Sequence, residues 1–406
     1  MFSVHSDQQH QRYSPLYFLA ALGAGGLTVS FFMWLMFWVP HPGRPVPVFE
    51  DLITVFVANT PLLSLSVIVA MTGIAFFAFL MTRLLFWNFR SLDQWKQTSA
   101  YQLLKNSNNE TQLLAVPLTV AMALNVGFII GLVFIPKLWS IIEYLFPLAL
   151  IGFLATGFWA LRLMGDFWGR ILIQGGFDCS SNNSFSQLLP AFALSMVGVG
   201  LAAPAAMSHT TWVAGVSYVV SSFFIVSALL LTVIKLIIGL RAMMENGASE
   251  ESAPSLWIVI PILTVTSITL IRQEHGIHVH FEGHALAVDT FTMLTRFFVM
   301  QVAFALFGWM VLHRFRYFSR FVSGPEHSAG SFTLVCPGVA LVVMTQFLIN
   351  KGFVAVNLVE KFGMVYWVLT AFALLLQAAT IGLVLILNAK HFGKSPNTSF
   401  APNQSL

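Results

Sequence analysis

Residues Leu188–Ala203 read LLPAFALSMVGVGLAA, an apolar run with Pro190 near its start and Gly198 and Gly200 in its second half. Four other segments open an apolar run with proline in the same way. They are Ser14–Leu27 (SPLYFLAALGAGGL), Val116–Gly131 (VPLTVAMALNVGFIIG), Ile260–Leu270 (IPILTVTSITL) and Cys336–Leu348 (CPGVALVVMTQFL). This self-similarity indicates a repeated unit of supersecondary structure.

Five prolines set the register of this repeat: Pro15, Pro117, Pro190, Pro261 and Pro337. Gly25, Gly127 and Gly200 occupy equivalent positions after three of them. Proline removes a helical hydrogen bond and kinks a helix, whereas glycine lets backbones approach closely, so we predict bent, tightly packed helices. A chance coincidence is the alternative, because proline is common near helix ends.

The composition is that of a membrane protein. Hydrophobic residues make up 57% of the 406 residues and charged residues 9%, and the mean hydropathy is +0.80. Soluble domains carry about 25% charged residues. The net charge of +4 forms no basic stripe, so we expect no nucleic-acid partner and instead expect contact with anionic lipid. Two cysteines, Cys179 and Cys336, provide no disulfide framework.

Ten apolar runs are long enough to cross the bilayer as helices. They cover residues 15–39, 55–87, 112–135, 138–163, 185–207, 212–241, 255–272, 286–312, 331–350 and 363–389. We therefore predict a cytoplasmic N-terminal segment (1–14), one transmembrane domain (15–390) and a disordered cytoplasmic tail (391–406).

Lysine and arginine near the span ends gather mostly on the N-terminal side, which predicts an integral protein of the plasma (inner) membrane with both termini in the cytoplasm. Because a proline-led segment opens every odd span, all five repeats run in the same direction. We predict an all-α integral membrane fold of five helical hairpins in a pseudo-five-fold arrangement, with the odd helices lining a central pore. Ordinary packing of small residues between helices is the alternative.

The ten spans and three segments, SPLYFLAALGAGGL, LLPAFALSMVGVGLAAP and SLWIVIPILTVTSITL, resemble the tellurite-resistance/dicarboxylate transporter family, which includes the plant slow anion channels. The resemblance covers roughly residues 14–390. It implies five hairpins around a pore, a homotrimer, and channel-like or carrier-like passage of anions. One departure concerns the gate: Cys336 lies where channel members carry a gating phenylalanine, and Phe347, Phe18 or Phe192 are the alternatives for that role.

Helical spacing from each proline predicts which residues face the pore. The predicted pore-lining residues are Phe18, Gly25, Gly127, Phe192, Ala193, Gly200, Thr264, Cys336, Ala340, Met344 and Phe347. This wall is apolar with a few hydroxyls and no fixed charge, so it would hold an anion weakly enough for release.

Polar side chains inside spans are candidates for function. Asn125, Arg296 and Gln346 are the main ones, with Arg296 expected to pair with Asp289 or to contribute positive potential to an anion path. Hydrogen bonding between helices is the alternative. Near another span end, Asp166 and Arg170 are spaced as a helical ion pair.

The segment 272–284 contains four histidines, His275, His278, His280 and His284. Imidazole ligands for zinc or copper are one interpretation, and a solvated loop that titrates at the pore mouth is the other. No closed metal site is predicted, we expect no cofactor, and no catalytic motif indicates an enzyme.

The sequence thus favours transport of a small inorganic or organic anion across the lipid bilayer. A proton-coupled dicarboxylate carrier is one alternative. The other is a membrane anchor of a respiratory complex, which would need facing histidines to hold haem; His209 and His313, both at span ends, are the main candidates.

Overall fold

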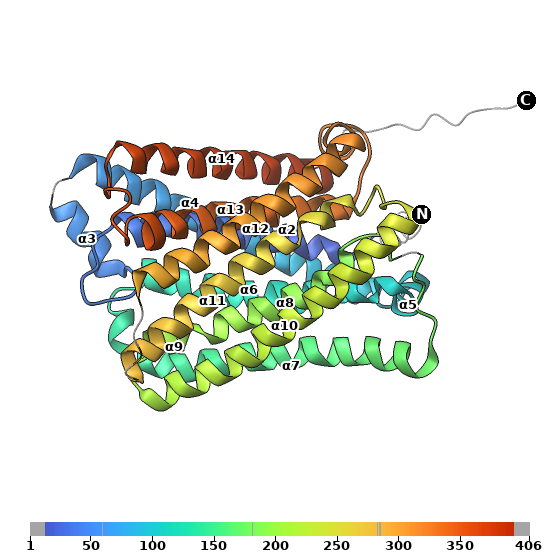
Figure 1. The fold of residues 1–406 in the computed structure, drawn as a ribbon, viewed down its shortest axis with the longest axis horizontal. Coiled ribbons are helices and arrows are strands. Elements are labelled where there is room, and N and C mark those ends of the chain that lie inside the picture. Colours follow the sequence, from blue (N-terminus) through green and yellow to red (C-terminus); the bar gives the residue numbers. More distant parts are fainter. Residues whose placement is uncertain (1–12, 59, 181, 282, 284–285, 394–406) are drawn as a thin grey trace, which may run out of the picture.

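The computed structural model describes residues 13–58, 60–180, 182–281, 283 and 286–393 (Figure 1). Within these residues the regular secondary structure is helical, and ten helices are long and apolar enough to cross a membrane. The predicted all-α fold is therefore confirmed, and it includes ten helices of the length and composition that the predicted spans require. The predicted segment 1–14 and the predicted tail 391–406 lie almost wholly outside the described residues.

The spans alternate between two groups. The proline-led spans contain the inner helices α2 (Phe18–Trp38), α6 (Ala115–Phe134), α8 (Leu189–Leu201), α11 (Val259–His280) and α13 (Val335–Phe347). Between them come the outer helices α4 (Pro61–Trp95), α7 (Ile142–Gln174), α10 (Thr211–Asn246), α12 (Ala287–Arg314) and α14 (Met364–Phe392). The connections contain the short helices α3 (Phe49–Val57), α5 (Ser99–Lys105) and α9 (Ala203–Met207).

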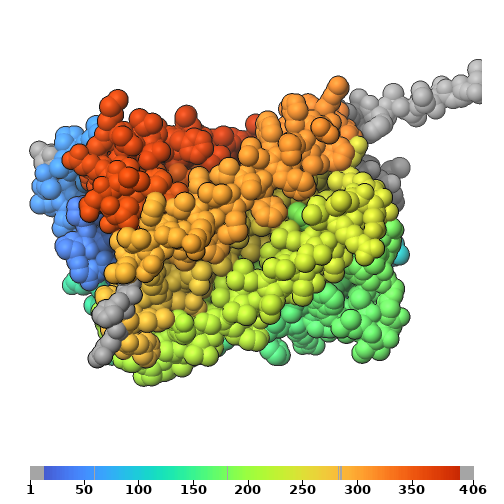
Figure 2. Space-filling view, viewed as in Figure 1, coloured from blue at the N-terminus to red at the C-terminus, as the bar shows by residue number. Residues whose placement is uncertain are grey.

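Burial separates the inner from the outer helices. In the most apolar stretch of each inner span, 61% to 94% of the residues are buried, against 17% to 33% in the outer spans. Large apolar side chains of the outer helices, such as Leu62, Phe79, Phe158 and Leu375, are exposed. On the face seen in Figure 2, α10, α12 and α14 cover much of the surface. The outer helices therefore present the apolar surface that lipid would contact.

The inner helices form a closed ring of contacts. Helix α2 packs against α6, α6 against α8, α8 against α11, α11 against α13, and α13 packs back against α2. Each outer helix packs on the ring: α4 on α2, α7 and α10 on α8, α12 on α11, and α14 on α13. The two ends of the described chain meet, because the Tyr17 hydroxyl lies 3.2 Å from Nδ1 of His391.

Every inner span starts as a 3₁₀-helix and continues as an α-helix. The 3₁₀ segments are η1 (Pro15–Tyr17), η2 (Asn108–Leu114), η4 (Ser186–Leu188), η5 (Ala253–Trp257) and η7 (Ala329–Leu334). All five repeat prolines lie within three residues of the change from 3₁₀ to α. Pro15 lies in η1, and the other four lie in the first turn of their α-helices; the bend expected from each stays a prediction.

The repeated glycines have different surroundings. A Cβ atom at Gly200 would overlap the ring of Phe153 from α7, and one at Gly25 would overlap Met81 of α4. At Gly127, by contrast, a Cβ would meet nothing. Two of the three glycines therefore admit a side chain of an outer helix against the inner backbone, which is the packing role that small residues have in membranes.

Buried amides of the outer helices tie them to the ring. Gln377 accepts a hydrogen bond from Trp34 Nε1 at 3.0 Å and donates one to Ser30 Oγ at 3.0 Å. Gln301 Nε2 donates to the Thr264 hydroxyl at 2.6 Å. These hydrogen bonds join one helix to another. They also satisfy amide groups that would otherwise be buried in apolar surroundings without a partner.

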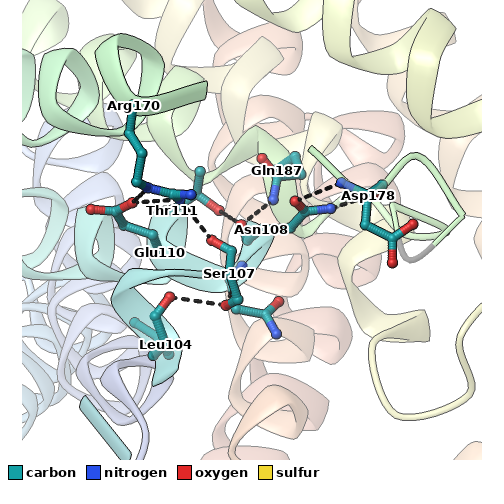
Figure 3. A network of polar contacts seen from close by, with 9 residues as sticks. Leu104, Ser107, Asn108, Glu110, Thr111, Arg170, Asp178 and Gln187 are labelled. Carbon is teal, nitrogen blue, oxygen red and sulfur yellow. Dashed lines mark hydrogen bonds and ion pairs between the residues drawn. The ribbon is translucent and has the colours of Figure 1, made fainter. Parts of the chain in front are cut away.

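A polar network joins three segments at one end of the bundle (Figure 3). Arg170 of α7 pairs with Glu110 of η2, with Nη2 and Oε2 2.9 Å apart, rather than with Asp166 as its helical spacing predicts. Beside this pair, Asn108 Nδ2 donates to the carbonyl of Asp178 at 2.6 Å. The network anchors η2 and the segment after α7 to each other.

The surroundings of Gly200 and Gly127 predict that an added methyl group lowers thermal stability at the first position but not at the second. Gly200→Ala should lower the thermal stability of the purified protein in detergent, since overpacking costs about 1–3 kcal/mol. Gly127→Ala is the matched control and should leave stability unchanged or raise it by up to about 1 kcal/mol. Equal melting temperatures for the two variants would contradict the packing of Phe153 on Gly200.

Loss of the buried carboxylate in the network should also destabilise the fold. Glu110→Gln removes the charge that Arg170 pairs with and should cost about 2 kcal/mol. The control is Asp93→Asn, which breaks the exposed Lys96–Asp93 pair and should cost less than about 0.5 kcal/mol. Thermal unfolding in detergent measures both, and a control that loses as much as Glu110→Gln would refute the assignment.

Candidate functional site: the central cavity

A cavity of about 500 Å³ lies inside the ring of inner helices. Each inner helix contributes to its wall, for example with Leu22 of α2, Phe128 of α6, Met196 of α8, Ile268 of α11 and Val343 of α13. Most of the wall is apolar. A cavity with an apolar wall and a few placed polar groups is the usual form of a small-molecule site.

Several residues predicted to face the pore line this cavity. They are Phe192, Thr264, Cys336, Ala340 and Phe347, together with the polar candidate Asn125. Thr264 is held in place there, because its hydroxyl donates to the carbonyl of Ala340 at 3.1 Å and accepts from Gln301. The polar side chains Thr264 and Asn125 thus lie on the wall from α11 and α6.

The remaining predicted pore-lining residues are not part of the wall: Phe18, Gly25, Gly127, Ala193, Gly200 and Met344. Phe18 packs against the ring of Phe89 in α4, and Gly127 faces a separate outer groove between α4 and α6. The physical reason is that the inner helices are apolar on all sides. Their hydrophobic pattern therefore does not determine how each helix is rotated about its axis.

Neighbouring residues line the cavity wall at the positions predicted for Gly25 and Gly200. On α2, Gly23 and Gly26 line the cavity where Gly25 was expected. At Gly200, the wall is formed by Phe153 of the outer helix α7, whose ring passes over the glycine. The side chain of an outer helix thus completes the wall through a gap left by glycine.

Charged and titratable side chains line the cavity toward the C-terminal ends of the inner spans. They are Arg272, Glu274 and His275 of α11, and Lys351, which follows α13 in the π-helical segment η8 (Leu348–Phe353). The prediction of a wall without fixed charge is therefore corrected. Helix α11 continues to His280, so the spacing Ile268–Ile271–Arg272–His275 continues one helical face beyond the apolar run.

A backbone carbonyl of a neighbouring inner helix positions Arg272. Its Nη1 atom donates to the carbonyl of Val199 at 2.6 Å. Val199 lies in the last turn of α8, where helix carbonyls lack intrahelical partners and accept other donors. Within the described chain Arg272 forms no ion pair with a carboxylate, so its charge is not neutralised at contact distance.

Among the described residues, the one carboxylate on the wall is held from outside the ring. Glu274 accepts a hydrogen bond from the Thr290 hydroxyl of α12 at 3.2 Å. Lys361, in the connection after η8, lies close enough to Lys351 for their charges to interact. Burial first, and the charge of Lys351 second, lower the pKa of Lys361 below its ordinary value. This end of the cavity therefore carries more positive than negative groups.

The histidine cluster is divided among separate contacts. Nδ1 of His278 is 2.7 Å from the Gly283 carbonyl, and Nε2 of His280 is 2.9 Å from the Ser208 carbonyl. His275 lies on the cavity wall, and His284 lies outside the described residues. In the part of the chain that the structure describes, no three histidine, cysteine or carboxylate residues are grouped as metal ligands would be.

The other two polar candidates lie away from the cavity. Arg296 is exposed on α12, and no ion pair joins it to Asp289 within the described residues. Gln346 is buried on α13, where Asn350 Nδ2 donates to its carbonyl at 2.9 Å. Asn350 in turn accepts from the Tyr366 hydroxyl of α14 at 3.1 Å, so these residues tie α13 to its outer neighbour.

Comparison with known proteins finds no protein-family model and no curated protein that matches the sequence.

Proposed function

We propose that this protein carries small anions through the central cavity, as the resemblance to the tellurite-resistance/dicarboxylate transporter family implies. In this proposal the ten spans form five hairpins related by a pseudo-five-fold axis, and the inner helices line the pore. The observation that carries it is the closed ring of buried helices around an apolar cavity whose wall includes Arg272 and Lys351.

Two properties of the wall favour anions. The cations at one end raise the local concentration of anions by attraction. Beyond them the wall is mostly apolar, with Thr264 and Asn125 as its polar side chains in the middle, so an anion would be bound weakly there and could leave again. Transport needs both entry and release, and this distribution of charge supports both.

The proposed orientation places the ends of the chain in the cytoplasm and the cationic end of the cavity on the opposite side. The contact between Tyr17 and His391 is consistent with both termini lying on one side of the membrane. Assembly as a homotrimer and residence in the plasma (inner) membrane are further parts of the proposal, based on the family resemblance and the positive-inside rule.

A proton-coupled carrier is the second candidate, and one observation favours it. Glu274 and His275 give the cavity wall two groups that can bind and release protons. The respiratory-anchor alternative has less support, because His209 follows α9 whereas His313 lies at the far end of the 28-residue helix α12. A haem ligated by two histidines would need them to face each other.

Flux into liposomes tests the proposal. Purified protein should carry one or more of nitrate, chloride, sulfite, malate and tellurite down a concentration gradient. An imposed proton gradient should shift the reversal potential only in a coupled carrier. The transport proposal fails if protein-loaded and empty liposomes take up all five anions equally, and a Soret band in the purified protein would favour the anchor.

A large side chain in the cavity should block the passage. Ala340→Phe fills space on the wall and should reduce anion flux by about tenfold or more. Ala378→Phe is the matched control, because Ala378 is exposed on the outer helix α14 and should retain flux within about twofold. Equal flux in the two variants would exclude this cavity as the route.

A further inference from the structure

We propose that the central cavity binds a medium-chain monocarboxylate such as octanoate, with the carboxylate at Arg272 and the alkyl chain along the apolar wall. The inference rests on the proposed function and names the class of substrate that the same cavity would take. It joins three features of the cavity: its length, the apolar character of most of its wall, and the free donors of one arginine.

The cavity is long for its volume. Its wall extends from Leu22 to Met36 on α2 and from Pro261 to His275 on α11. An α-helix rises about 1.5 Å per residue, so each of these stretches is about 20 Å long. A volume of about 500 Å³ distributed over that length makes a narrow passage. This shape fits an extended chain better than a compact ion.

The apolar part of the wall is suited to an alkyl chain. Methionine has a flexible, polarisable side chain that adapts to apolar ligands of varied shape. Methionines from four helices line the cavity: Met33 and Met36 of α2, Met122 of α6, Met196 of α8 and Met207 of α9. Each CH₂ group that a ligand buries against such a surface should strengthen binding by about fourfold.

The middle of the wall offers few hydrogen bonds to replace the water around an inorganic anion. The O–H group of Thr264 donates to the Ala340 carbonyl at 3.1 Å. The amide nitrogen of Asn125 donates to the Ala121 carbonyl at 3.0 Å and to Sδ of Met196 at 3.9 Å. Because both side chains already use their donors, a small ion there would lose its hydration without replacement hydrogen bonds. An alkyl chain loses no hydrogen bonds on entering the same space.

Arg272 provides the site for the carboxylate. Its guanidinium carries five N–H groups in a planar fork, and one nitrogen donates to the Val199 carbonyl. No other hydrogen bond from this guanidinium reaches a described residue, and no described carboxylate pairs with it. Since Arg272 lines the cavity, its remaining donors are available to a ligand inside it. One arginine is sufficient here, because the fork can donate to both oxygens of one carboxylate.

The charged and apolar parts of the wall are separated along the cavity. Arg272, His275 and Lys351 lie at its C-terminal end. Thr264 and Ala340, which are in contact, lie about 12 Å before Arg272 along the axis of α11. A ligand charged at one end only matches this division. A dicarboxylate of the same length would place its second charge against apolar side chains, at a cost in free energy.

Competition binding tests this site separately from transport. The full chain in lipid nanodiscs is equilibrated with radiolabelled octanoate, and empty nanodiscs give the amount that dissolves in lipid. Unlabelled butyrate, hexanoate and octanoate should compete with half-inhibitory concentrations that fall by about tenfold for each pair of carbons added. Suberate has the length of octanoate with a carboxylate at each end, and octylamine has a positive head. Each should compete at least about tenfold more weakly than octanoate.

Two variants assign the two ends of the ligand. Arg272→Gln removes the charged donors and should raise the half-inhibitory concentration of octanoate by about tenfold. Ala340→Phe shortens the apolar space, so it should weaken octanoate by about tenfold and change butyrate by less than about twofold. The controls are Arg296→Gln on the exposed face of α12 and Ala378→Phe on the exposed face of α14. Both should change octanoate binding by less than about twofold.

The outcomes separate this site from transport. Butyrate that competes as well as octanoate, or suberate that does so, overturns the proposal, and neither comparison depends on the folding of a variant. Octanoate binding that Arg272→Gln and Ala340→Phe leave unchanged also overturns it, because the ligand would then lie outside the cavity. Nitrate or malate flux without octanoate binding refutes this site and leaves the proposed transport intact. Octanoate binding without flux of any anion supports the site and refutes the transport.

Discussion

Close packing of helices that are mostly buried inside the protein is the constraint on which this structure depends. Lipid provides no hydrophobic force between helices, so contact and internal hydrogen bonds must hold the inner ring together. Gly200 provides close contact, because it leaves room for Phe153 of the outer helix α7. Gln301 of the outer helix α12 provides a hydrogen bond, because it donates to Thr264 of the inner helix α11. Both interactions also shape the cavity wall, because Phe153 and Thr264 line it. Stability and the form of the cavity therefore come from the same contacts.

The distribution of charge follows from a second constraint, the cost of ionised groups at membrane depth. Such groups are tolerated where they line a cavity or contact backbone carbonyls. Arg272 does both, since it lies on the wall and donates to Val199 where α8 ends. The break between α8 and α9, just before Pro204, leaves terminal carbonyls there, and Ser217 caps another of them at Leu201. Helix ends thus provide the polar positions that an otherwise apolar cavity lacks.

Part of the candidate site could be predicted from the sequence. Thr264, Cys336 and Ala340 were found because they lie close to the repeat prolines, at the start of α11 and α13. Arg272 and Lys351 were missed for a different reason. Arg272 is the last residue of the predicted span 255–272, and Lys351 follows the predicted span 331–350, so the spacing from the repeat prolines does not extend to either residue. The helical backbone continues past both residues, as α11 and as η8.

The sequence by itself determined the ten spans, their alternation and the start of each inner helix, because length, apolar composition and proline act locally. Only the tertiary structure decided which side of each inner helix meets the cavity and which partner Arg170 takes. A helix that is apolar all round has nearly the same free energy in any rotation until its neighbours are in place. The ion pair Arg170–Glu110 likewise joins residues far apart in the chain, so their positions in the sequence do not predict it.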